Sequence, residues 1–204
     1  MKLYGAHMAA NPRRVKIYIA EKGGLAAVEQ VDLTPPYDVM RSDDFLTKNP
    51  AGRIPVLELD DGTWLPESAA IIEYLEELYP EPNMLGATPE ARAMTRAFDR
   101  MTHDLFIWLR TYLPHKFPAR GVGAVRHPEV AEVLEPTIER ALNNIDIRIG
   151  DNLFLTNSER PMIADCHLYA LMTGAGKFGW EIPDKYTRLK GWYDRFSERP
   201  SANA

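Results

Sequence analysis

The sequence has little of several features that mark large classes of protein. Cys166 is the only cysteine in 204 residues, so no disulfide can form within the chain and a reducing cytoplasm is the expected location. No apolar run approaches the roughly 20 residues that a membrane-spanning helix needs. The first residues, Met1 to Gly5, lack the long apolar core of a signal peptide. We therefore expect a cytoplasmic protein without membrane contact.

The chain also lacks an excess of positive charge. The chain has 24 lysine and arginine residues against 29 acidic ones, a formal net charge of −5. Nucleic acid is therefore not expected as a partner, because phosphate binding needs a basic face. No His-Glu-x-x-His pattern or cysteine cluster predicts a metal site, and no metal is expected. The 45% hydrophobic share is ordinary for a globular protein, and the length suits one large domain or two small ones.

Local patterns in residues 1–80 predict a mixed four-stranded sheet with helices on its faces. A helix is expected to begin at Asn11-Pro12, since asparagine suits the N-cap and proline the first helical position. It is expected to end at Lys22-Gly23-Gly24, a basic last turn followed by glycine. The expected strands and helices, in order, are 2–4, 11–22, 28–33, 43–48, 55–59, 63–65 and 68–78. This order predicts an α/β domain.

The pattern changes after residues 81–88, whose composition is that of a linker. From residue 89 to 113 apolar residues recur four apart, which predicts a long helix with a broad apolar face. Pro114, Pro118 and Gly121–Gly123 are expected to break it, and Pro136 to kink or restart the next helix. Further helices are expected at 129–149, 163–172 and 186–198. The rest of the chain is therefore predicted to be all-helical.

The stretch from Asn49 to Leu59 is unusual, because a glycine-containing turn leads through Ile54-Pro55 into an apolar run. Proline cannot donate to a strand ladder, so a cis peptide bond in a tight turn is expected before Pro55. The backbone of Ile54 would then be available to pair with something other than the sheet. Glu67 and Ser68 follow at the start of a helix.

Two helix starts, at Asn11 and Ser68, are candidate anion sites, because a helix N-terminus presents free N–H groups and positive charge. Both residues could equally be simple caps. If both helices face one small ligand, the carboxylate of Glu67 suggests that this ligand is a zwitterion, whose ammonium group would pair with Glu67.

The run Gly174 to Lys177 superficially suggests a phosphate loop but lacks the required spacing, so we predict a turn after a helix. Cys166 lies in an apolar run and is predicted to be an inert core thiol.

These residues resemble a cytosolic glutathione S-transferase. The turn Asn49–Pro55, the pair Glu67-Ser68, the run Ile163–Asp165 and the final Trp192–Pro200 follow the family pattern in the right order. The resemblance implies a thioredoxin-like domain at 1–80, a linker at 81–88 and an α-helical bundle domain at 89–204. It also implies a homodimer and glutathione as the co-substrate.

The resemblance also assigns glutathione-binding residues. Ile54, set up by Pro55, would pair its backbone with the cysteinyl unit. Glu67 and Ser68 would hold the γ-glutamyl ammonium and carboxylate. The remaining candidates are basic. Arg53 would also contact the tripeptide, and Arg41 and Lys48 are equally good candidates for binding its glycyl carboxylate.

The sequence departs from the family at the catalytic position. Tyr4 comes one residue early for the tyrosine type, and one residue along a strand reverses the face. Ala9 and Ala10 stand where other classes have serine or threonine, and the loop has no cysteine. What remains resembles bacterial Nu-like members, in which an asparagine at the helix start contacts the thiol. Asn11 matches that position, where the helix dipole would also stabilise a thiolate.

A second departure is Met162, where the family commonly has serine or threonine as the cap of a helix. Methionine offers no oxygen to the backbone, so about 1 kcal/mol of capping is expected to be lost. Asp165 can still favour the helix start through its charge.

The function expected from the resemblance is conjugation of the glutathione thiolate to small hydrophobic electrophiles. Two alternatives remain open: a glutathione-dependent disulfide reductase or peroxidase on the same site, and a non-catalytic binding or regulatory protein. The face of the long helix that would meet the electrophile cannot be identified from its periodicity, since aromatic residues at helical spacing are usually core. The candidates for the electrophile pocket are His7, Met8, Phe106, Trp108 and Tyr112.

Overall fold

A computed structural model describes residues 1–7, 9–117 and 125–204 of the chain. The chain divides into two compact units, Met1–Met84 with Asn203–Ala204, and Leu85–Ala202. The domain bounds drawn from the sequence, with a separate linker at 81–88, stay a prediction. In the described part of the chain, no helix is both long enough and apolar enough to span a membrane.

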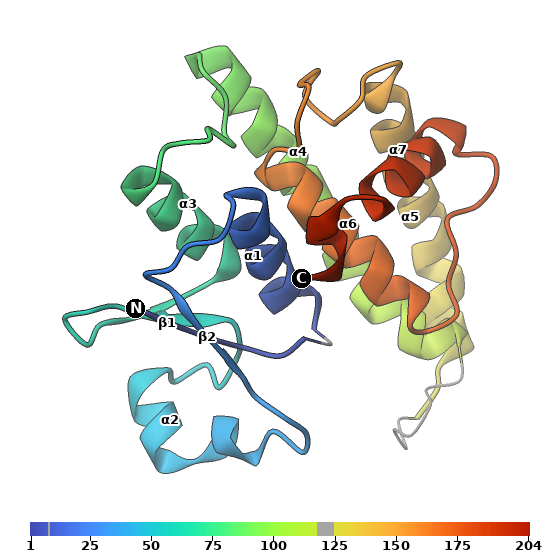
Figure 1. Cartoon of the computed structure of the whole chain (residues 1–204). Helices are drawn as coiled ribbons and strands as arrows, with labels where there is room; N and C mark the ends of the chain where they lie inside the picture. The colour runs from blue at the N-terminus through green and yellow to red at the C-terminus, as the bar shows by residue number, and fades with distance from the viewer. Residues whose placement is uncertain (8, 118–124) are drawn as a thin grey trace. The chain divides into compact units, whose positions relative to one another are not determined.

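The first unit is built on a mixed four-stranded sheet in the order β2-β1-β3-β4. Strand β1 is parallel to β2, and β3 is antiparallel to both β1 and β4. Helices α1 and α3 lie on one face of the sheet and α2 lies on the other (Figure 1). The elements are β1 (Lys2–Gly5), α1 (Ala10–Glu21), β2 (Glu29–Asp32), the 3-10 helix η1 (Asp38–Arg41), α2 (Asp43–Lys48), β3 (Val56–Glu58), β4 (Trp64–Pro66) and α3 (Ser68–Leu78). The predicted α/β fold of this half is confirmed.

Alternation along the strands gives the sheet two different faces. Leu3 and Leu57 are paired across β1 and β3, and both are fully buried on the face that α1 and α3 cover. On the opposite face Tyr4 stacks on Trp64 with ring centroids 5.0 Å apart. Phe45 of α2 meets the same Trp64 ring edge-on at 5.5 Å. The sheet is therefore covered on both sides, with an aliphatic layer and an aromatic one.

The two residues that the sequence predicts as N-caps lie inside helices α1 and α3. Helix α1 begins at Ala10, so Asn11 is its second residue, and Ala9 stands at the N-cap without a side-chain hydrogen bond. Helix α3 begins at Ser68, and Glu67 occupies its N-cap position. The interpretation of Asn11 and Ser68 as caps is therefore wrong. Pro12 is the third helical residue, two positions later than expected, and is tolerated because the first four N–H groups of a helix have no intrahelical partner.

A buried ion pair ties the ends of α1 and α3 together. The Lys22 Nζ atom lies 2.7 Å from Glu76 Oε2, and the two side chains are 0% and 5% exposed. Glu76 also accepts hydrogen bonds from the Tyr18 hydroxyl at 2.8 Å and the Met84 backbone N–H at 2.7 Å. Lys22 donates to two backbone carbonyls, those of Tyr79 and Pro82, each at 2.7 Å. All three ammonium hydrogens thus have an acceptor.

The second unit is all-helical, as predicted. Helix α4 packs against α5 and α6, and α7 packs against α5. Helix α6 is buried on nearly every side, and Cys166 within it is fully buried and forms no disulfide within the described residues. The elements are α4 (Pro89–Lys116), α5 (Pro128–Ile149), α6 (Ile163–Gly176), α7 (Thr187–Ser197) and the 3-10 helix η2 (Pro200–Asn203), whose last residue belongs to the first unit.

Two of the predicted interruptions, the break at Pro114 and the new start at Pro136, do not occur, and the kink expected as the alternative at Pro136 stays a prediction. Helix α4 continues through Pro114 to Lys116, and α5 continues through Pro136 without a new start. Proline in a helix interior costs about 3 kcal/mol, and packing of a long buried face against neighbouring helices offsets that cost. The breaks predicted at Pro118 and Gly121–Gly123 lie outside the described residues.

The start of α6 depends on Asp165. Its Oδ2 atom accepts from the Met162 N–H at 2.9 Å, so the acid caps a helix whose N-cap residue has no oxygen to offer. Its Oδ1 atom accepts from the Leu155 N–H at 3.1 Å and from Trp192 Nε1 at 2.8 Å. Asp165 is fully buried, and this burial raises the pKa of its carboxyl to about 6, although the hydrogen bonds act in the opposite direction.

Candidate functional site

The register of the sheet brings three segments to one edge. In the β3–β4 pair Val56 lies opposite Pro66, so residues 54–55 and 67–68 continue side by side beyond the ladder. Tyr4 of β1 is also paired with Val56, so the loop after β1 leaves at the same edge. Opposite residues of antiparallel strands have Cα atoms only about 4.5–5.5 Å apart. Residues predicted separately from three parts of the sequence are therefore neighbours here.

The loop after β1 leads directly into α1. Pro12 packs against Gly5, where an added Cβ would lie 3.0 Å from Pro12 Cβ. Within the described residues no side chain caps the first turn of α1, and Pro12 has no N–H, so the N–H groups of Ala10 and Asn11 are the donors left without an intrahelical partner there. These N–H groups carry the positive end of the helix dipole. His7 is exposed in this loop, and Met8 lies outside the described residues.

Glu67 has a strained backbone at this edge. Its φ of 69° and ψ of 113° place a non-glycine residue in a sparsely populated region. Its carbonyl accepts from the Ile71 N–H at 2.9 Å, which begins the helical bonding of α3. The side chain is exposed. Strain of this kind is typically found where a ligand is held, and here it sets a carboxylate at the N-terminus of a helix.

Ser68 contacts a residue that the sequence analysis did not identify. Arg14 Nη1 donates to Ser68 Oγ at 3.4 Å, and the two residues are 2% and 6% exposed. The contact joins α1 to the first turn of α3. Because the guanidinium occupies a lone pair of Oγ, the hydroxyl hydrogen is left to point elsewhere. The spacing of the sequence could have identified Arg14 as a residue of the buried helix face, because Arg14 precedes the buried Ile17 and Tyr18 by three and four residues.

The turn before β3 is held by its own side chains. Asn49 Nδ2 donates to the Arg53 carbonyl at 2.7 Å, and the Gly52 N–H donates to the Asn49 carbonyl at 2.9 Å. Gly52 has a φ of 55°, and an added Cβ would lie 3.2 Å from both the Met40 carbonyl and Leu46 Cδ2. Glycine is therefore needed for its backbone angle and for the close approach of η1.

The Ile54-Pro55 peptide bond is cis, which confirms the prediction from the sequence. Strand β3 begins only at Val56, so Ile54 lies outside the ladder. No hydrogen bond within the described residues engages the N–H or C=O of Ile54. The side chain of the neighbouring Arg53 is exposed.

The two basic candidates for the glycyl carboxylate differ in their surroundings. Lys48 Nζ lies 3.0 Å from Asp44 Oδ2 and 5.3 Å from the Trp64 ring centroid, so it is engaged on the α2 face of the sheet. Arg41 is exposed at the end of η1, and the carbonyl of the residue before it lies against the glycine turn. Within the described residues, Lys48 has an ion-pair partner and Arg41 has none.

Tyr4 is engaged on the other face of the sheet. Its hydroxyl donates to Glu58 Oε2 at 2.7 Å. Burial and this hydrogen bond raise the pKa of Tyr4 to about 12. A phenol that is committed to a carboxylate, on the face away from α1, is poorly suited to stabilise a thiolate at the start of α1.

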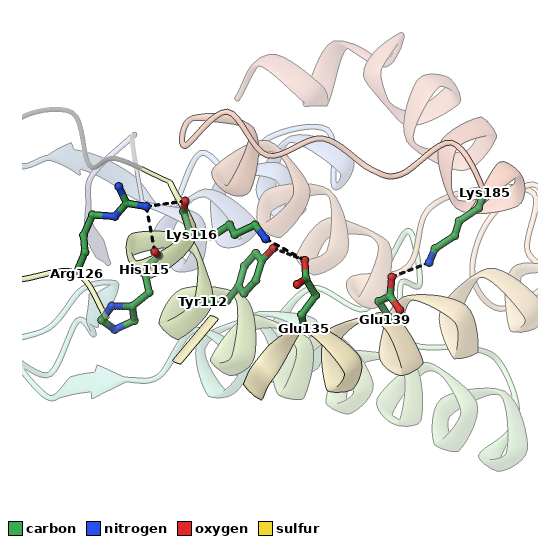
Figure 2. Close-up of polar contacts among 7 residues, drawn as sticks. All are labelled: Tyr112, His115, Lys116, Arg126, Glu135, Glu139 and Lys185. Atoms are coloured by element: carbon green, nitrogen blue, oxygen red, sulfur yellow. Dashed lines mark hydrogen bonds and ion pairs between the residues drawn. The ribbon is translucent and has the colours of Figure 1, made fainter. Parts of the chain in front are cut away.

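The three candidates on α4 do not share a helix face. Trp108 and Tyr112 are four residues apart and lie on one side, whereas Phe106 is about 200° around the helix from Trp108. Tyr112 is buried, and its hydroxyl donates to Glu135 Oε1 at 3.0 Å (Figure 2). Burial and this bond raise the pKa of Tyr112 to about 12. The Tyr112 hydroxyl therefore links α4 to α5, while Phe106 and Trp108 are half-buried.

The C-terminal end of α4 carries further polar contacts that are not predicted from the sequence. Arg126 Nη2 donates to the carbonyls of Lys116 at 2.9 Å and His115 at 3.3 Å (Figure 2). Lys116 Nζ lies 3.4 Å from Glu135 Oε1, beside the Tyr112 hydroxyl. A cation on the last carbonyls of a helix stabilises its negative end.

The chain matches two family models. Residues 10–78 match "Glutathione S-transferase, N-terminal domain", and residues 107–200 match "Glutathione S-transferase, C-terminal domain". It is 31% identical over 211 residues to glutathione S-transferase 2 of Saccharomyces cerevisiae, across 98% of this chain and 87% of that protein. It is 30% identical over 202 residues to maleylacetoacetate isomerase of Pseudomonas aeruginosa, across 98% and 93%.

A solved structure has the same fold across the whole chain. The crystal structure of a glutathione S-transferase domain-containing protein from Marinobacter aquaeolei superposes with a TM-score of 0.86 at 31% identity. The match covers 99% of this chain and 100% of that one.

Proposed function

Because the chain belongs to the glutathione S-transferase family, we propose that it conjugates the thiolate of glutathione to small hydrophobic electrophiles. The observation that carries the proposal is the meeting of three segments at one sheet edge: residues 54–55, residues 67–68 and the start of α1. An extended zwitterionic peptide suits this arrangement, because it could pair with the backbone of Ile54, with the carboxylate of Glu67 and with the N-termini of α1 and α3. The family relationship also supports a cytoplasmic homodimer.

The γ-glutamyl end of glutathione binds at the start of α3 in this proposal. Its carboxylate accepts hydrogen bonds from the Ser68 hydroxyl and the free N–H groups of the helix. Arg14 acts behind Ser68, since its donation to Oγ directs the hydroxyl hydrogen toward the ligand. Glu67 pairs with the ammonium group. The cysteinyl unit pairs with the backbone of Ile54, and Arg41 rather than Lys48 meets the glycyl carboxylate.

The chemistry takes place at the start of α1. The glutathione thiol gives its proton to solvent, and the sulfur anion is stabilised by the N–H groups of Ala10 and Asn11, with the Asn11 side-chain amide donating one further hydrogen bond. The sulfur then attacks the electrophilic carbon and forms a carbon–sulfur bond. With an aryl halide the halide leaves with the electron pair of the broken bond.

Replacing Asn11 by alanine is expected to raise the pKa of bound glutathione by about one unit, which corresponds to ~1.4 kcal/mol of lost thiolate stabilisation. The value of kcat/KM near neutral pH should fall about tenfold. The pH dependence of kcat/KM with an aryl halide measures both effects. Asn143→Ala, an exposed asparagine of α5, is the matched control and should change neither. If Asn11→Ala leaves pKa and turnover intact, the role given to Asn11 is wrong.

Replacing Ser68 by alanine is expected to weaken glutathione binding by about tenfold to a hundredfold, because a hydrogen bond to a charged group contributes roughly 1.5–3 kcal/mol. Calorimetric titration with glutathione gives the dissociation constant directly. Ser197→Ala, at an exposed position of α7, should bind as the unmodified protein does.

The same titration tests the basic residues. Arg41→Ala should raise the dissociation constant several-fold more than Lys48→Ala, since Lys48 is already paired with Asp44. Equal effects, or a larger effect at Lys48, would reject the choice of Arg41. An unchanged affinity in Ser68→Ala would reject the placement of the γ-glutamyl carboxylate.

Other glutathione-dependent reactions can use the same glutathione-binding residues. A disulfide reductase or peroxidase needs a second glutathione instead of a protein cysteine, and the relative from Pseudomonas aeruginosa is named as an isomerase of maleylacetoacetate. Purified protein with glutathione should therefore be assayed against an aryl halide, a disulfide, a hydroperoxide and maleylacetoacetate. Conjugation of the aryl halide at the highest kcat/KM supports the proposal. Stabilisation by glutathione without turnover of any substrate would favour a binding protein.

A further inference from the structure

The helical unit contains a cavity that the glutathione residues do not line. Its volume is about 310 Å³, near the lower limit for sites that bind small molecules. It lies where the end of α6, the segment after it and α7 come together. The lining residues are Met172, Gly176, Gly179, Trp180, Glu181, Ile182, Lys190, Tyr193 and Asp194.

One wall of the cavity is bare backbone. Helix α6 ends at Gly176, and the Gly179 N–H donates to the Gly176 carbonyl at 2.9 Å. A Cβ added at either glycine would meet no atom within 4 Å. Gly179 needs glycine for its φ of 82°, but Gly176 has no such requirement. At Gly176 the missing side chain therefore keeps space open rather than permitting a turn. This end of α6 includes Gly174 and Gly176, the glycines of the run that superficially suggests a phosphate loop in the sequence.

Two of the apolar side chains in the lining, Trp180 and Tyr193, are aromatic, and two, Met172 and Ile182, are aliphatic. Trp180 is 8% exposed, and Met172 beside it in the lining is also buried. Tyr193 stacks on Tyr169 with ring centroids 5.3 Å apart, which fixes the orientation of its ring. Aromatic faces attract flat rings and organic cations, and tryptophan does so most strongly.

The charges at the cavity select the sign of a ligand. Lys190, the single basic residue of the lining, is ion-paired with Asp184. Asp184 first, and then Asp194 and Glu181, raise the pKa of Lys190, so its ammonium stays charged and committed to these acids. Within the described part of the chain, neither Glu181 nor Asp194 has an ion pair of its own within 4 Å. The lining therefore has two carboxylates, Glu181 and Asp194, against one ammonium that is already paired with Asp184 outside it, and this leaves the rim negative.

We propose that this cavity binds a small aromatic cation, whose ring packs against Trp180 and Tyr193 and whose ammonium group lies near Glu181 and Asp194. The site is independent of the glutathione residues, none of which lines it. The open wall at Gly176 admits the ring, and the acidic rim excludes an anion of the same shape.

The test is a calorimetric titration of the full-length protein with 1-naphthylmethylammonium, repeated with 1-naphthoate. We expect submillimolar binding of the cation and none of the anion. The double variant Glu181→Gln/Asp194→Asn should raise the dissociation constant of the cation about fivefold, as for two partly exposed charge pairs. Gly176→Leu should weaken it by about tenfold or more, since a side chain then fills the opening.

Controls separate this site from others. The double variant Asp151→Asn/Glu159→Gln removes two exposed acids elsewhere in the helical unit and should bind the cation unchanged. Saturating glutathione should not displace the probe. Circular dichroism shows whether each variant is folded. If Gly176→Leu does not fold, the double variant Glu181→Gln/Asp194→Asn still tests the proposal. Absence of cation binding, equal binding of the anion, displacement by glutathione, or unchanged affinity in the charge variant would each overturn the proposal.

Discussion

Replacing Glu76 by alanine is expected to lower the free energy of unfolding by about 3–5 kcal/mol. Lys22, whose side chain has no exposure, would keep its charge in the interior without the carboxylate that balances it. The Tyr18 hydroxyl and the Met84 N–H would also lose their acceptor. Urea denaturation at pH 7, followed by circular dichroism, measures the change.

An exposed ion pair provides the comparison. Lys185 and Glu139 also lie 2.7 Å apart, but each side chain is 55% exposed, so Glu139→Ala should cost no more than about 1 kcal/mol. Replacing both buried partners, as Lys22→Met/Glu76→Leu, should recover part of the stability that Glu76→Ala loses, because no unpaired charge remains. A loss for Glu76→Ala as small as that for Glu139→Ala would show that the buried cluster does not stabilise the first unit.

Replacing Asp165 by alanine is expected to cost about 3 kcal/mol or more. Three N–H donors, from Met162, Leu155 and Trp192, would be left in the interior without an acceptor, and each such group costs roughly 1–3 kcal/mol. Asp165→Asn should cost less, because an amide oxygen can still accept at the Oδ1 position. Urea denaturation of both variants gives the values, and equal losses for the two would contradict this account of the site.

The pH dependence follows from the raised pKa of Asp165. The carboxyl has a pKa of about 6 in the folded protein against 3.8 for an ordinary aspartate. Between these values the folded state holds a proton that the unfolded state has released. The stability of the unmodified protein relative to Asp165→Asn should therefore be greatest below pH ~4 and fall as pH rises to ~6. A difference that grows over this range would mean that the hydrogen bonds outweigh burial.

Much of the fold could be predicted because its signals are local. The order of strands and helices follows from periodicity, and the cis peptide bond before Pro55 follows from a proline at the start of a strand. Helix α2 occupies the predicted residues, Asp43–Lys48. Each of these features is encoded within about ten residues of sequence.

The features that could not be predicted depend on contacts between distant residues. Arg14 and Ser68 are 54 residues apart, and only the packing of α1 beside α3 brings them together. Tyr112 is a candidate for the electrophile pocket on the sequence alone, because nothing nearby in the sequence shows that its hydroxyl donates to Glu135. Pro114 and Pro136 look like helix breakers locally, yet both helices continue through them.

The backbone of Glu67 sets two selective pressures against each other. A glycine there would adopt the positive φ without strain and would make the first unit more stable, but it would leave no carboxylate at the start of α3. Selection for a robust fold and selection for the ligand thus favour different residues at one position. If the proposed role of Glu67 is right, sequences evolved for stability alone would drift to glycine at residue 67 and lose affinity for glutathione as they did so.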